Sequence, residues 1–77
     1  LVNTSGSGLN IQVDNIDLTP YVQVGDWVEN QSNLEIQQVL SINYMAPNTY
    51  INLNNSFMMG TPSSIGFQQA NHFNPKH

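Results

Sequence analysis

Hydrophobic and polar residues alternate along much of this chain with a period of two. The clearest runs of like parity are Leu9, Ile11 and Val13, then Thr49, Ile51 and Leu53, and finally Ser63, Ile65 and Phe67. This period is typical of strands that bury one face against a core. The pattern predicts strands over 9–13, 49–53 and 63–67, with Ile16 and Leu18 prolonging the first.

The longest regular segment covers residues 35–44. Its apolar residues lie mostly at even-numbered positions, namely Ile36, Leu40, Ile42 and Tyr44. Val39 lies at an odd-numbered position. A helix is the alternative, because apolar residues here also recur at helical spacing. We favour a strand, since β-branched and aromatic residues dominate, no capping residue precedes the segment and the flanking segments are strand-like.

Turn-forming residues separate the predicted strands. Gly-Asp at 25–26 precedes a strand that begins at Trp27, and the polar stretch 29–33 predicts a loop. A further turn is predicted at 45–48. The Asn-Asn pair at 54–55 tolerates left-handed backbone, which predicts a tight hairpin.

Five or six short strands predict an all-β fold, a small antiparallel barrel or sandwich of five to six strands. We expect a flexible N-terminal segment over 1–8, a single β-domain over 9–67 and an extended C-terminal tail over 68–77. The chain begins at Leu1 rather than Met, which fits a processed start or a piece of a longer protein. A domain this short buries only about 60% of the surface of its unfolded chain, so its own core is marginal.

The chain carries one Lys, no Arg and five acidic residues, and its formal net charge is −4. Nucleic-acid-binding proteins need basic residues to neutralise phosphates, and the single cation here is Lys76. The absence of Cys excludes a disulfide framework and a Cys-ligated zinc module. No apolar run is long enough to span a bilayer. We therefore expect neither nucleic acid nor a membrane as a partner.

Amides and hydroxyls take the place of charged side chains. The chain has twelve Asn, seven Gln, seven Ser and four Thr. Such a surface is polar but uncharged, whereas a soluble monomer normally carries more charges of both signs. Two interpretations stay open: much of the surface contacts other protein, or the composition reflects an Asn-rich lineage.

Candidate acid–base residues are few, and they form no catalytic pattern. They are Asp14, Asp17, Asp26, Glu29, Glu35, His72 and His77. Both histidines lie in the C-terminal tail, so the domain offers none for a catalytic triad. The pair Asp14 and Asp17 suggests calcium as a minor alternative, although the Gly and closing Glu of a helical-hand loop are missing. We expect a non-enzymatic protein without cofactor or metal.

Sugar binding is a second alternative, because aromatic rings stack on sugars and amides supply hydrogen bonds. The aromatic candidates are Trp27, Tyr21, Tyr44 and Tyr50. The single Trp of a small domain is usually a core residue, so we expect Trp27 in the core. Three Asn-x-Ser/Thr strings, at Asn3, Asn30 and Asn54, match glycosylation acceptors and matter only in a secreted eukaryotic protein.

Several large apolar residues lie in or beside predicted turns, where a small domain cannot bury them all. We expect partner contacts at Met45, Tyr50, Phe57, Met58, Met59 and Phe73. Met adapts to irregular partner surfaces, and such a patch exceeds what small monomers usually expose. The alternative is that Phe57 and Met59 plug an open end of the barrel.

The order of these features from Val13 to Phe67 resembles a small β-module of tailed-bacteriophage virion proteins. The matching pieces are Val-Gly-Asp-Trp-Val at 24–28, Leu34, Val-Leu-Ser-Ile at 39–42, Ile-Asn-Leu-Asn at 51–54, and Gly-Thr through Ile-Gly-Phe at 60–67. The family's loop commonly has Gly-Ile-Pro where this chain has Asn-Leu-Glu at 33–35. The match covers about two-thirds of the chain.

The resemblance implies a non-enzymatic structural protein of the virion, in the first place a capsid decoration or cement protein on the capsid surface. Its partner would be the major capsid protein or another virion structural protein, in a homo-oligomeric or symmetric arrangement. The alternatives are a neck or tail subunit and a receptor- or glycan-binding module of a tail or fibre.

Overall fold

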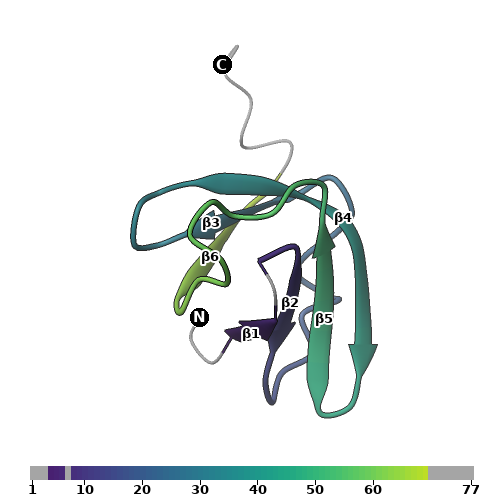
Figure 1. The fold of residues 1–77 in the computed structure, drawn as a ribbon. Helices are drawn as coiled ribbons and strands as arrows, with labels where there is room; N and C mark the ends of the chain where they lie inside the picture. Colours follow the sequence, from purple (N-terminus) through teal and green to yellow (C-terminus); the bar gives the residue numbers. More distant parts are fainter. Residues whose placement is uncertain (1–3, 7, 70–77) are drawn as a thin grey trace.

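The computed structural model describes residues 4–6 and 8–69, which form an all-β fold of six strands (Figure 1). In chain order they are β1 (Thr4–Gly6), β2 (Asn10–Val13), β3 (Trp27–Asn30), β4 (Ile36–Met45), β5 (Asn48–Leu53) and β6 (Ile65–Gln68). Every strand predicted from the alternation is confirmed, with shifts of one or two residues at its ends. The search for membrane-spanning helices found none among the described residues.

All six strands belong to one antiparallel sheet in the order β1-β2-β5-β4-β3-β6. β4 is shared, because its first residues pair with β3 and its later residues pair with β5. Figure 1 shows β4 arching over the molecule between these two neighbours. The sheet therefore has two arms: β6 and β3 continue from one half of β4, and β5, β2 and β1 continue from the other.

The all-β class is confirmed, whereas the expected closure into a barrel is wrong for the described strands. β1 and β6 stand at opposite ends of the strand order and do not pair with each other. The connection between β5 and β6 lies against β1, where the Thr61 hydroxyl donates to the Gly6 carbonyl at 2.5 Å. A side-chain hydrogen bond thus occupies a site where β1 would need a backbone partner for closure.

A β-bulge in β4 decides which of its residues face the core. Val39 pairs with Leu53 and Ser41 pairs with Asn52, which leaves Leu40 as the extra residue. An extra residue reverses the alternation of faces from that point onward. Val39 is accordingly 1% exposed and Leu40 is 59% exposed. The expectation that Leu40 shares a face with its even-numbered neighbours throughout the strand is therefore wrong.

The core fills the space between the two arms of the sheet. Its buried apolar residues are Ile11, Val13, Leu18, Val22, Val28, Val39, Ile51, Leu53, Phe57 and Ile65. Leu18 and Val22 come from the connection between β2 and β3, and Phe57 comes from the connection between β5 and β6. Phe57, for which we expected a partner contact, is thus a core residue, so the structure gives that expected contact no support.

Thr49 holds the connection between β2 and β3 against β5. Its hydroxyl is fully buried, accepts a hydrogen bond from the Leu18 amide at 3.0 Å and donates one to the Ile16 carbonyl at 2.6 Å. Asn15, with φ of 61°, turns the chain out of β2. Ile16 and Leu18 therefore do not prolong the strand as expected.

β1 lies within the segment 1–8, which we expected to be a flexible lead-in. Thr4–Gly6 pairs antiparallel with β2, with Gly6 opposite Ile11. A Cβ atom on Gly6 would lie 1.8 Å from the Asn10 carbonyl oxygen, so this close approach requires glycine. Alternation of apolar residues could not reveal this strand, because Thr4–Gly6 contains no apolar residue. Residues 1–3 and 7 of the lead-in, and 70–77 of the expected tail, lie outside the described residues.

The hairpin expected at 54–55 is not formed. β5 already has β2 on one side and β4 on the other, so the segment after it cannot pair with it. Residues 54–64 instead make an irregular connection to β6. Among the described non-glycine residues, left-handed backbone occurs at Asn15 and Leu34 rather than at the Asn-Asn pair.

The bulge can be tested with neighbouring alanine substitutions. Val39→Ala should lower the free energy of unfolding by about 2 kcal/mol, because it removes buried methyl groups. Leu40→Ala removes more atoms but from an exposed site, and should change it by less than about 0.5 kcal/mol. Urea denaturation followed by Trp27 fluorescence measures both. A larger loss in Leu40→Ala than in Val39→Ala would show that the alternation runs through β4 without a bulge.

Candidate functional site

The structure separates the six predicted contact residues. Met45, Met58 and Met59 are strongly exposed, Tyr50 is half-buried, Phe57 belongs to the core, and Phe73 lies outside the described residues. Met45 ends β4, whereas Met58 and Met59 follow the opposite end of β5 (Figure 1). A strand of this length spans about 20 Å. These residues therefore offer two separate apolar sites and not one patch.

Met58 and Met59 are the most exposed of the described hydrophobic residues, at 89% and 81%. The Glu35 carboxylate holds the backbone beneath them, since both of its oxygens accept from the Met58 amide, at 3.2 and 3.3 Å. Gln37 Nε2 donates to the same carboxylate at 2.9 Å. The exposed Leu34 immediately precedes Glu35. The two exposed methionines thus sit on an anchored segment close to a further exposed apolar side chain.

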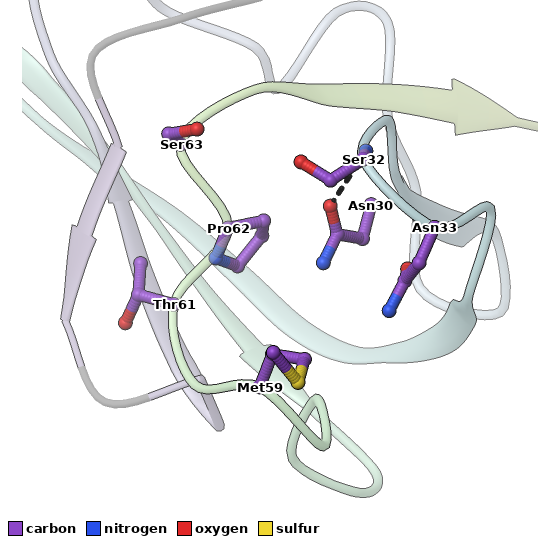
Figure 2. Close-up of a pocket in the computed structure, with 7 residues that line it drawn as sticks. All are labelled: Asn30, Ser32, Asn33, Met59, Thr61, Pro62 and Ser63. Atoms are coloured by element: carbon purple, nitrogen blue, oxygen red, sulfur yellow. Dashed lines mark hydrogen bonds between the residues drawn. The ribbon is translucent and has the colours of Figure 1, made fainter.

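A pocket of about 440 Å³ opens beside Met59, between the loop that follows β3 and the connection between β5 and β6 (Figure 2). It is lined by Asn30, Ser32, Asn33, Met59, Thr61, Pro62 and Ser63. None of these side chains is charged. Pockets of this size, with a few polar groups beside apolar surface, are typical of small-ligand sites.

Asn30 forms the buried part of this pocket. It is 3% exposed, and its Oδ1 accepts a hydrogen bond from the Ser32 amide at 2.9 Å. Its backbone carbonyl also accepts from the Leu34 amide at 2.7 Å, which closes the loop. The sequence analysis named Asn30 only as a match to a glycosylation acceptor and missed its buried position. Asn30 has the same parity as buried Val28, so a strand continuing to residue 30 would have placed it inward.

The outer face of the arm formed by β2, β5 and β4 carries uncharged polar groups and Tyr50, with the exposed Met45 opposite Asn48 at its end. Its two cross-strand rows are Gln12, Tyr50 and Asn43, and Asn10, Asn52 and Ser41. Asn52 Nδ2 donates to Ser41 Oγ at 2.8 Å. The amide-rich composition is therefore concentrated here on a pleated surface, which we call the amide face.

Trp27 is not a core residue, and that expectation is wrong. In β3 the buried positions are Val28 and Asn30, so Trp27 lies on the opposite face. Its cross-strand partners are Gln38 on β4 and Gln68 on β6. Trp27 and Val28 are adjacent and both apolar, so the sequence did not show which of them faces the core. In the structure the smaller residue, Val28, is buried. The aromatic ring is half-exposed between two amide-bearing positions.

Asp14 and Asp17 make local contacts and do not form a shared site. Asp17 Oδ1 accepts from both the amide and the hydroxyl of Thr19, at 2.9 and 2.6 Å. Asp14 Oδ1 accepts from Gln12 Nε2 at 2.8 Å. Over residues 4–6 and 8–69, no three His, Asp or Glu side chains are grouped so as to hold a metal ion. The calcium alternative thus gains no support from the geometry, and His72 and His77 lie outside the described residues.

Comparisons with known proteins found no match: no protein-family model, curated protein or solved structure matches this chain. The resemblance to the phage β-module stays a prediction from the order of motifs. The functional argument therefore rests on the surfaces described above.

The anchor beneath the methionines can be tested by removing the Glu35 carboxylate. Glu35→Ala should lower the heteronuclear NOE of the Met58 and Met59 amides, because it deletes the acceptor that orders them. Glu29→Ala is the matched control, since that carboxylate accepts from Gln31 Nε2 in the loop after β3. Equal NOE values in Glu35→Ala and the unaltered protein would mean that the segment is ordered by other contacts.

Proposed function

We propose that this protein is a non-enzymatic structural protein of a tailed-bacteriophage virion, a capsid decoration protein that binds neighbouring shell subunits. The observation that carries the proposal is the exposure of Met58 and Met59 on an anchored segment. Burying apolar surface contributes about 25 cal/mol per Å², so two long side chains are a substantial unused source of binding energy. Met also adapts its shape to a partner.

Anchoring favours binding, because a segment that is already ordered loses less conformational entropy on association. The Glu35 carboxylate supplies this order at Met58 before any partner arrives. The amide face adds a second kind of contact, hydrogen bonds between uncharged groups. Such contacts depend little on ionic strength. A domain with one Lys and no Arg has few other ways to attach firmly to a shell.

The small core supports the same proposal. Ten buried apolar residues form it, and no disulfide assists them, since the chain lacks Cys. Binding to a partner stabilises the folded state by mass action. A symmetric arrangement of copies on a capsid surface would bury part of each amide face and both exposed methionines, and so stabilise protein and shell together.

Introducing negative charges at the two methionines tests the proposed contact. Met58→Asp together with Met59→Asp should abolish co-sedimentation with particles or sheets of the shell protein, while circular dichroism shows an intact fold. Tyr21→Asp together with Val24→Asp is the matched control, because it adds the same charge at two exposed apolar residues elsewhere. Retained co-sedimentation of the methionine variant would contradict the contact.

A glycan-binding module of a tail or fibre is the second candidate, and the position of Trp27 favours it. An aromatic ring flanked by Gln38 and Gln68 combines a stacking surface with amide groups. A glycan array distinguishes the two functions. Reproducible binding that is lost in Trp27→Ala and kept in Tyr21→Ala would support this candidate, whereas no binding by the unaltered protein would remove it.

A further inference from the structure

The pocket beside Met59 has a hydrogen-bond donor at its base that the protein does not use. Asn30 Oδ1 is occupied by the Ser32 amide, while Nδ2 has no hydrogen-bond partner among the described residues. The same side chain is 97% buried by its neighbours, since only 3% of the residue is exposed. Figure 2 shows Nδ2 pointing away from Ser32 and into the pocket. No fully buried side-chain nitrogen or oxygen of the described residues lacks a partner, so Nδ2 is open to the pocket and can donate to an acceptor on a ligand there.

The rest of the lining indicates which ligand fits. The hydroxyls of Ser32 and Ser63 face one another across the pocket, and the Met59 side chain lies on the opposite side (Figure 2). Hydroxyls both donate and accept, so they match the hydroxyls of a ligand. Met59 and Pro62 supply apolar surface. No lining residue is charged, so nothing compensates a phosphate, a carboxylate or an ammonium group.

The pocket lies between two segments, the loop after β3 and the connection between β5 and β6. Hydrogen bonds join these segments at both ends of the pocket and keep it open in the absence of a ligand. At one end the Gln31 amide donates to the Ser64 carbonyl at 3.0 Å. At the other end Glu35 accepts from the Met58 amide. A site that is formed in advance spares the ligand the entropic cost of ordering it.

From these three observations we propose that the pocket binds a small uncharged molecule rich in hydroxyl groups, a neutral saccharide unit. Asn30 Nδ2 donates to a ring or hydroxyl oxygen, Ser32 and Ser63 exchange hydrogen bonds with neighbouring hydroxyls, and Met59 covers an apolar C–H face of the sugar. This site differs from the Trp27 surface. It shares Met59 with the proposed protein contact, but saccharide binding at the pocket needs no shell protein.

The test uses the full chain and four sugars: glucose, galactose, mannose and N-acetylglucosamine. At millimolar concentration, at least one should shift the Asn30 side-chain amide signals in ¹⁵N–¹H spectra and show saturation transfer from the protein. Ser63→Trp should fill the pocket and abolish both effects. Ser56→Trp is the control, because Ser56 is exposed in the same connection but outside the pocket.

A second variant tests the donor itself. Asn30→Asp keeps the oxygen that caps Ser32 and replaces the Nδ2 donor with a carboxylate oxygen, which repels an acceptor on the ligand, so binding should weaken about tenfold or more. If this variant fails to fold, Ser63→Trp decides alone. The proposal is overturned if none of the four sugars shifts the Asn30 signals, or if saturation transfer persists in Ser63→Trp. Transfer lost in Trp27→Ala but kept in Ser63→Trp would assign the sugar to the Trp27 surface instead.

Discussion

The bulge at Leu40 is the constraint on which the rest of the structure depends. One strand, β4, serves both arms of the sheet, and its two halves must both turn apolar side chains toward a single core. A regular strand would keep one parity, and Val39 and Ile42 could not then face the same side. One extra residue reconciles them, with Val39 opposite Leu53 and Ile42 opposite Ile51. The bend and the shared core are therefore two results of the same local irregularity.

The core depends equally on segments outside the sheet. Leu18 and Val22 reach it from the first long connection, and Phe57 reaches it from the second. The buried hydroxyl of Thr49 fixes the first connection through two backbone groups, while Glu35 and the Gln31–Ser64 hydrogen bond fix the second. With the connection held in this way, the Phe57 ring fills the core at this point, and Met58 and Met59 remain exposed to solvent. An apolar run of three residues is thereby divided into one structural and two exposed side chains.

Two of these surfaces share one chemical property, which is the absence of charged side chains. The amide face and the lining of the pocket consist of amides, hydroxyls and apolar groups, whereas Glu29 shares the face of Trp27 on β3 and Glu35 lies at the Met58 amide. Recognition by such surfaces depends on shape and on the placement of hydrogen bonds, since there is little long-range electrostatic attraction. This suits a protein held at a crowded, fixed position better than one that must capture a charged partner from dilute solution.

The sequence by itself determined the all-β class, the places of five strands and the uncharged character of the surface, because alternation, turn residues and composition are local properties. It left open the parity of Trp27 and Val28 and the bulge at Leu40, since either choice gives a plausible strand. Tertiary structure decided these through pairing with neighbouring strands, and it also revealed β1, which contains no apolar residue. The pocket too belongs to the tertiary structure alone: residues 30–33 and 59–63 are remote in the chain, and only the fold brings an unused Asn30 donor beside Met59 and Ser63.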